Sequence, residues 1–217
     1  MVTRLRMTRL SRHGVLILAI VLGFCGTVPR AAGKADVAES PTVLKVRLTA
    51  NNELSAMSQA ALINEAESIW RDARVQLRWI RDNRTDEDRP LRIVIARREV
   101  AATGHQWPVA ELLRFEDHSA IALASITAAL RIVEEQPELP LGGLSSVRQY
   151  KLGVVLGRAV AHEIGHYLLQ SNSHSPYGLM RASIDAREFA DLRTGAFRLD
   201  RESQAFLAAK ALASRSE

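Results

Sequence analysis

The sequence of 217 residues has little of several features that define particular classes of protein. It contains one cysteine, Cys25, only 5% aromatic residues, and neither an internal repeat nor a low-complexity tract. A disulfide framework, a zinc site built from several cysteines and a repeat architecture are therefore excluded. The uncharged run at residues 14–28 is shorter than the roughly 18 apolar residues that a membrane-spanning helix needs.

Residues 1–33 have the composition of a secretory signal peptide. Four arginines between residues 4 and 12 precede the uncharged run, and small residues occupy positions 31–33. A basic region, a short apolar region and small residues at the cleavage site are typical of such peptides. We therefore expect export to a bacterial periplasm or to the extracellular space, with no membrane attachment after cleavage.

Removal of the signal peptide changes the charge and the cysteine content. Residues 1–33 carry five arginines and no acids, so Lys+Arg falls from 29 to 24 and equals the 24 Asp+Glu. A formally neutral chain gives no electrostatic reason to expect nucleic acid as a partner. Cys25 is lost too, so thiolate ligation of a metal is excluded. With 47% hydrophobic residues, we expect a short disordered segment at 34–42 and a single domain at 43–217.

Hydrophobic periodicity predicts the first half of an α+β fold. Alternating apolar residues predict strands at 43–48 and 75–80, and the continuous apolar run at 91–96 predicts a central strand. Apolar residues at helical spacing predict a long helix at 52–74. This order of strands and helix favours a mixed, twisted sheet with a long first helix.

The second half is expected to be mainly helical. Residues 120–126 and 129–133 are interpreted as paired strands, with one continuous helix as the alternative, and residues 104–117 show no clear period. A helix is predicted at 147–169, begun by a capping box of Ser146 and Gln149. Loops are expected at 83–89 and 136–143, and in a small C-terminal helical lobe residues 195–212 end in an amphipathic helix.

The strongest chemical signal is His-Glu-Ile-Gly-His at residues 162–166, inside the predicted helix. Positions i and i+4 share a helix face, so His162 and His166 can present imidazole nitrogens to one tetrahedral ion. Glu163 projects beside them and can take a proton from a zinc-bound water, whose pKa the metal lowers to about 7. This pattern is typical of zinc metalloproteases. The alternative is a buried helix with two hydrogen-bonded histidines.

A catalytic zinc ion commonly has three protein ligands. The best candidate for the third is His174, because residues 170–173 form helix poorly and Asn172 tolerates a left-handed turn. The chain can then return toward the metal. Glu188 is the competing candidate, although it also fits the solvated face of a short helix.

At these positions the sequence resembles the metzincins, especially their matrixin-like and short bacterial forms. That family has His-Glu-x-x-His-x-x-Gly-x-x-His followed by a methionine in a tight turn. The resemblance covers about residues 146–181, and the matching residues are His162, Glu163, His166, His174 and Met180. Leu169 stands where the family has glycine and Asn172 where it has the third histidine, so the turn here is two residues longer.

The resemblance implies a metzincin-like fold and a zinc-dependent endopeptidase with Glu163 as general base. It implies an upper lobe at 43–172, a lower lobe at 173–217, and Met180 packed beneath the histidines. It also implies a peptide substrate bound antiparallel to an edge strand, which we place within 120–126. We expect a monomer that acts on proteins or peptides. Glu188 as third ligand would make the chain resemble the gluzincins instead.

Other residues carry weaker signals. Tyr177 or Tyr150 could stabilise an oxyanion, but neither has the usual place after the methionine, so structural roles are favoured for both. His105 and His118 are interpreted as loop histidines. A zinc-binding module that holds peptides without cleaving them is the alternative function, and Glu163 argues against it because a binding site does not need that carboxylate.

Overall fold

The computed structural model describes residues 41–50, 52–80, 90–99, 108–135, 145–193 and 195–213. The predicted signal peptide, residues 34–40, the predicted loops at 83–89 and 136–143, and His105 lie outside these ranges. The elements follow in the order β1 (Thr42–Thr49), α1 (Ala56–Asp72), β2 (Val75–Trp79), β3 (Leu91–Ala96), β4 (Ala110–Arg114), β5 (Ala120–Ser125), α2 (Ile126–Glu134), α3 (Ser145–Leu169), α4 (Ala186–Ala190) and α5 (Arg201–Ala213).

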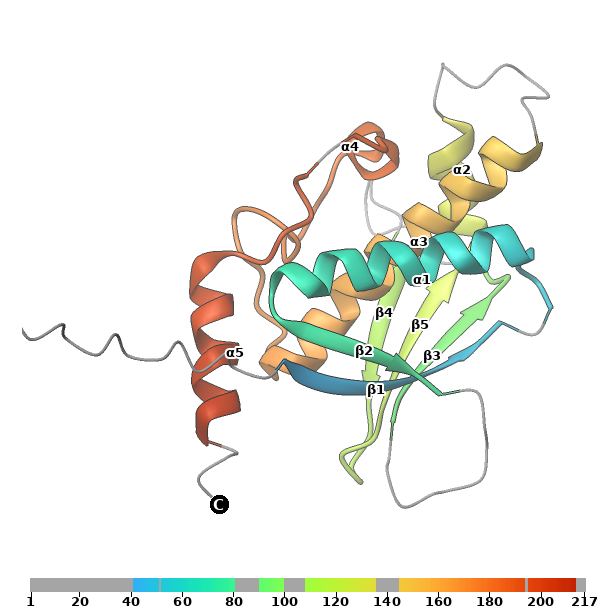
Figure 1. Cartoon of the computed structure of the whole chain (residues 1–217). Coiled ribbons are helices and arrows are strands. Elements are labelled where there is room, and N and C mark those ends of the chain that lie inside the picture. Colours follow the sequence, from blue (N-terminus) through green and yellow to red (C-terminus); the bar gives the residue numbers. More distant parts are fainter. Residues whose placement is uncertain are drawn as a thin grey trace, which may run out of the picture. The chain divides into compact units, whose positions relative to one another are not determined.

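Five strands form one mixed sheet in the order β2-β1-β3-β5-β4 (Figure 1). β1 pairs in parallel with β2 and β3, and β3 pairs in parallel with β5. Among the strands of the described residues, only β4 is antiparallel, and it pairs with β5. Alternate residues of β3 are buried, namely Leu91, Ile93 and Ile95, as expected for a strand with one face on the core. The α+β class, the mixed sheet and the central position of residues 91–96 are confirmed.

Helices α1 and α3 lie side by side over the sheet (Figure 1). α1 begins after Ser55, whose hydroxyl accepts a hydrogen bond from the N–H of Ser58 (3.1 Å). It starts later than the predicted residue 52, because Asn52 has a left-handed backbone with φ 59°. A Cβ at Gly153 of α3 would lie 2.6 Å from the Cβ of Ala61. The missing side chain therefore lets the two helices cross closely.

Two predictions about the middle of the chain were wrong. Residues 129–133 belong to helix α2, which follows β5 directly because the Ser125 hydroxyl accepts from the N–H of Ala128 (3.1 Å). The partner of β5 is instead β4, in a stretch where no regular structure was predicted. β4 is consequently the edge strand beside β5, and residues 120–126 do not form an edge.

The helices in the second half of the chain also differ from prediction in where they begin. Ser145 already belongs to α3, so the capping box at Ser146 is wrong, and Gln149 Nε2 donates instead to Ser145 Oγ (3.0 Å). The helix expected at the end of residues 195–212 is α5, which begins at Arg201, and Leu207 is its one buried residue. The amphipathic pattern came partly from Phe197 and Leu199, which are buried in the segment before the helix. No helix within the described ranges is both long enough and apolar enough to cross a bilayer.

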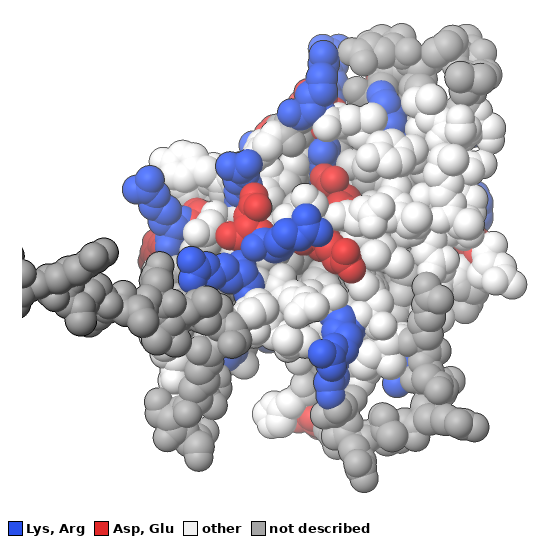
Figure 2. Space-filling view, viewed as in Figure 1, with Lys and Arg blue, Asp and Glu red and all other residues white. Residues whose placement is uncertain are grey.

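Ion pairs connect segments that are far apart in the sequence. Arg198 Nε lies 3.3 Å from the Asp72 carboxylate, and Arg158 Nε lies 2.7 Å from that of Glu65. On the face drawn in Figure 2, basic and acidic side chains are interspersed. This arrangement agrees with the formal neutrality of residues 34–217.

Candidate metal centre and active site

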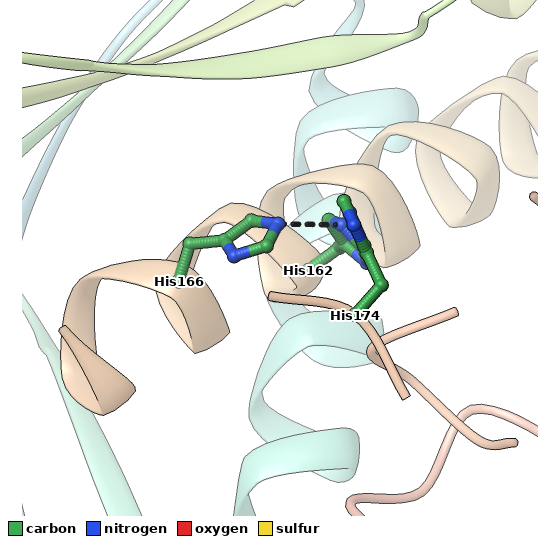
Figure 3. Close-up of side chains that lie close together, drawn as sticks. All are labelled: His162, His166 and His174. Atoms are coloured by element: carbon green, nitrogen blue, oxygen red, sulfur yellow. Dashed lines mark hydrogen bonds between the residues drawn. The ribbon is translucent and has the colours of Figure 1, made fainter. Parts of the chain in front are cut away.

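Helix α3 places two histidines of the motif against each other. His162 and His166 are one helical turn apart, and their Nε2 atoms are 3.0 Å apart (dashed line in Figure 3). Their rings meet edge to face, with centroids 4.7 Å apart. Nitrogens about 2.0–2.1 Å from one tetrahedral ion are separated by roughly 3.3 Å, so this spacing is close to that of a shared ligand pair.

The other nitrogen of each ring bonds a backbone carbonyl. His162 Nδ1 is 2.8 Å from the oxygen of Leu179, and His166 Nδ1 is 2.7 Å from that of Ser171. Because a carbonyl oxygen only accepts, both Nδ1 atoms must carry the proton. Both Nε2 atoms therefore present lone pairs to the same point. Hydrogen bonds of this kind fix the tautomer and orientation of metal-binding histidines.

Both rings are held neutral, as metal ligation requires. Burial lowers the pKa of His162 to about 4, and His166 and His174 act in the same direction, against the hydrogen bond to Leu179. Burial also lowers the pKa of His166, helped by His174 and Arg114. At neutral pH a proton therefore does not bridge the facing lone pairs, and a bound cation would relieve their repulsion.

The turn after α3 returns the chain toward these rings. Gln170 is left-handed (φ 51°), its N–H donates to Tyr167 O (3.3 Å), and the N–H of Ser171 donates to His166 O (3.3 Å). This pair of bonds is a Schellman motif with glutamine in place of the usual glycine. The left-handed residue is thus Gln170, not Asn172 as predicted. It stands one position after Leu169, which accounts for one of the two extra residues of the turn.

His174 completes a cluster of three imidazoles. Its ring stacks on His162 (centroids 5.4 Å apart, 22° between planes) and meets His166 edge to face at 4.9 Å (Figure 3). One ligand atom from each of the three lies within 4.8 Å of the others. The structure therefore brings together the three histidines predicted as ligands. Three imidazoles fit zinc, which leaves a fourth position for water or substrate in catalytic sites.

The segment after His174 closes on itself. The N–H of Ser175 donates to Met180 O (2.8 Å), and its hydroxyl donates to Tyr177 O (2.6 Å). Gly178 is left-handed (φ 71°), and the N–H of Leu179 donates to Arg198 O (2.7 Å). These bonds aim the Leu179 carbonyl at His162 and place the buried Met180 side chain against Gly165, between the two histidines of the motif. The packing position expected for Met180 is the one observed.

Glu163 lies beside the histidines in the wall of the same cleft. It is 6% exposed. Burial raises the pKa of its carboxyl to about 7; Glu111 adds to the rise, and a hydrogen bond from the N–H of Leu112 opposes it. A carboxyl with its pKa near neutrality can both take up and release a proton.

The cleft has a volume of about 690 Å³, within the range of ligand sites. All four predicted site residues line it. The rest of its wall comes from the start of β4, from α2, from Ala159 of α3 and from the chain that leads from Arg181 into α4. These residues are Pro108, Val109, Ala110, Ala128, Arg131, Ile132, Glu135, Ala159, Arg181, Ala182, Ser183, Ile184, Asp185, Ala186 and Phe189. Small and apolar residues predominate among them.

Other predicted candidates lie outside the cluster. The Glu188 carboxylate accepts two hydrogen bonds from Arg181 (2.6 and 3.0 Å) and does not join the histidines, so its proposed role as third ligand is not favoured. Tyr177 is 73% exposed, and neither it nor Tyr150 lines the cleft. His118 lies in the turn between β4 and β5.

Sequence reasoning missed the groups that orient the site. Arg114 Nη2, at the end of β4, donates to His166 O (2.6 Å), and this bond joins the edge strand to the end of α3. The carbonyls of Ser171 and Leu179 orient the two rings. Backbone carbonyls carry no sequence signal, and Arg114 precedes its partner by 52 residues.

Neither a protein-family model nor a curated protein sequence matches the chain. Among solved structures, the fold is similar to that of archaemetzincin from Methanopyrus kandleri, with a TM-score of 0.46 and 13% sequence identity. That match covers 86% of this chain and 99% of the other. At this level the likeness transfers no chemistry to the residues of the cleft.

Proposed function

We propose that this protein is an exported zinc endopeptidase with a metzincin-type site. His162, His166 and His174 hold the metal, and Glu163 is the general base. The observation that carries the proposal is the convergence of three imidazoles. In the two that come from α3, His162 and His166, each Nδ1 donates a hydrogen bond to a backbone carbonyl. Such a pair leaves two lone pairs facing each other at 3.0 Å, an arrangement that a cation stabilises.

Zinc bound there would supply a Lewis acid that polarises the scissile carbonyl and acidifies the attacking water. Glu163 takes a proton from that water and later passes it to the leaving amine. Its burial beside the histidines supports this role, because desolvation makes a carboxylate a stronger base than it is in water. The hydrogen bonds that His162 and His166 donate to the carbonyl oxygens of Leu179 and Ser171 keep the two rings in place while the proton moves.

The edge of the sheet supports a peptide as the substrate class. Pro108, Val109 and Ala110 line the cleft where β4 begins, and β4 is an edge strand. An extended peptide can add to such an edge through backbone hydrogen bonds, largely independently of its sequence. We therefore place the substrate along β4, in contrast to the earlier expectation of residues 120–126. Export rests on residues 1–33, which have the composition of a signal peptide.

The test compares wild-type protein with the Glu163→Gln variant, which keeps the shape of the side chain but cannot act as a base. Both are purified without chelators, their zinc content is measured, and cleavage of unstructured casein is followed. We expect a single zinc ion in each and a loss of at least about 100-fold in kcat/KM for E163Q.

Two outcomes would overturn the proposal. Wild-type protein that holds zinc yet shows no cleavage dependent on Glu163 would point to a binding module that holds peptides without hydrolysing them. Protein that retains no zinc, and takes up none on titration, would leave the three histidines as a structural cluster.

A further inference from the structure

Arg158 is a buried cation that the proposed mechanism does not use. It lies in α3 one helical turn before His162 and is only 2% exposed. Its Nε donates to the Glu65 carboxylate of α1 (2.7 Å). Burying a guanidinium costs several kcal/mol unless its donors are satisfied, so its partners indicate what its presence stabilises.

The remaining partners of Arg158 lie at the end of α4. Nη1 donates to the carbonyl oxygens of Phe189 (2.9 Å) and Asp191 (3.0 Å), with Glu188 O slightly farther away at 3.4 Å. Helix ends leave such carbonyls without partners inside the helix. α4 spans only Ala186–Ala190, too short to be stable alone. Arg158 therefore acts as the C-terminal cap of this helix, supplied from another part of the chain.

An aromatic layer strengthens this attachment. The guanidinium carbon of Arg158 lies 4.4 Å from the centroid of the Phe197 ring, and that ring packs edge to face on Phe189 at 5.4 Å. A cation over an aromatic face adds attraction when both are desolvated. The position of Phe189 is thus set by its carbonyl and by its ring together.

The same residues form one wall of the cleft. Phe189 and Ala186 of α4 line it, as does the chain that leads into α4 from Arg181. Ala159, next to Arg158, lines it from α3. Arg181 and Glu188 form an ion pair that closes the base of the loop between them. The segment 181–191 is therefore held in two ways. The Arg181–Glu188 ion pair links its two ends, and Arg158 links it to α3, the helix that carries His162 and His166.

We infer that Arg158 is a positioning residue that holds α4 as a fixed wall of the cleft and thereby sets which substrate side chain the cleft accepts. This inference rests on the proposed peptidase function. Ala182, Ile184, Ala186 and Phe189 form the apolar part of this wall, against which an aliphatic substrate side chain can pack. A wall held at a fixed distance discriminates side chains by size, whereas one free to move does not.

The test uses Arg158→Lys in the full-length, zinc-loaded protein. Lysine keeps the charge but lacks the planar fork, so it cannot bond Glu65 and the α4 carbonyls together. Arg158→Met removes all these bonds, and the lysine variant serves where the methionine variant does not fold. Gly153→Ala is the matched control, because it disturbs α3 against α1, away from the cleft.

Activity is measured as a ratio that is insensitive to the amount of folded protein. A cleavage site is mapped in casein, and quenched fluorescent peptides of that sequence carry Leu or Ala at each flanking position in turn. The substrate position at which replacing Leu by Ala changes the wild-type kcat/KM most is taken as the one whose side chain occupies the cleft. We expect R158K to lower that ratio about tenfold, mainly through KM, and G153A to leave it unchanged while lowering Tm.

Hydrogen exchange gives a readout that does not depend on activity. We expect the amides of residues 185–191 to exchange faster in R158K, with the amides of residues 158–166 and the zinc content unchanged. An unchanged Leu/Ala ratio, or unchanged exchange at 185–191, would overturn the inference. If wild-type protein cleaves nothing, the peptidase proposal fails, and the exchange measurement alone decides whether Arg158 holds the wall.

Discussion

Met180 lies directly against Gly165, the residue just before His166. A Cβ on Gly165 would be 2.9 Å from Met180 Cε and closer still to its Sδ. Met180 is 2% exposed, and the Trp70 ring lies on the same side at 3.7 Å. The glycine of the motif therefore leaves the space that the Met180 side chain fills. This contact joins the helix that carries two histidines to the loop that carries the third.

The first prediction concerns this contact. Gly165→Ala should destabilise the protein by about 1–3 kcal/mol, because overpacking in a filled core exceeds the gain in helix propensity. Zinc affinity should fall with it, since displaced Met180 moves the neighbouring Leu179 carbonyl that orients His162. Urea unfolding and competition with a chelator measure the two effects.

Gly195→Ala is the control, because a Cβ at that position meets nothing within 4 Å. The double variant G165A/M180A should show an effect smaller than the sum of its single variants, as expected for residues in contact. Additive effects would mean that the two side chains do not compete for the same space.

The second prediction concerns the crossing of α1 and α3. A Cβ at Gly157 would lie 2.7 Å from the backbone oxygen of Leu62 and 2.8 Å from the Cβ of Glu65. Backbone atoms cannot rotate away, so Gly157→Ala should cost about 1–3 kcal/mol and lower Tm by about 2–4 °C per kcal/mol. Thermal unfolding followed by circular dichroism measures this. An unchanged or higher Tm would show that the helices separate freely.

The third prediction concerns the third ligand. His174→Ala should weaken zinc binding by more than about 100-fold, beyond what loss of an orienting partner costs. His118→Asn is the matched control, because His118 is outside the cluster and asparagine tolerates its left-handed backbone (φ 63°). Zinc affinity is measured by competition with a chromophoric chelator. Equal affinity of the two variants would remove His174 from the site.

The fourth prediction concerns acid stability. Asp200 accepts hydrogen bonds from the N–H and the hydroxyl of Ser203 (both 2.9 Å) at the start of α5. Burial raises the pKa of the Asp200 carboxyl, but the hydrogen bonds from Ser203 outweigh this effect and hold the pKa below its usual value. A carboxyl with a lowered pKa stabilises the fold above its unfolded pKa of about 3.9 and loses that contribution as pH falls further.

Asp200→Asn should therefore lower the free energy of unfolding at pH 6, and the difference from wild type should disappear toward pH 2. Asparagine remains a good helix cap, so the charge is what the comparison isolates. Urea unfolding of both proteins across this pH range provides the measurement. A difference in stability that stays constant with pH would contradict the assignment of the shift to Asp200.

Regular elements with strong alternation were predictable. Val75 to Trp79 and Leu91 to Ala96 alternate or are continuously apolar, and both are strands within a residue of prediction. Alternation reflects burial of one face of a strand, which depends on neighbouring residues in the chain. The spacing of His162 and His166 was equally predictive, because a helix alone places positions i and i+4 on one face.

Elements whose conformation depends on partners were not predictable. The stretch Ala-Glu-Leu-Leu-Arg of β4 consists of good helix formers, and it is a strand because β5 offers an edge with which it pairs. Ser125 ends β5 and caps α2 with one side chain, so two adjacent apolar runs that look alike adopt different structures. The turn at Gln170 lacks the glycine that marks most such turns.

The sequence by itself determined the fold class, the central strand, and the helix with two imidazoles and a carboxylate, since these follow from local periodicity. Tertiary structure decided that His174 meets the other two histidines, that β4 forms the edge of the sheet, and that Arg158 joins α3 to α4. Each of these contacts joins segments far apart in the sequence, and local periodicity does not determine how far apart such segments lie in space. Their geometry depends on hydrogen bonds to backbone atoms, which every residue possesses and no sequence distinguishes.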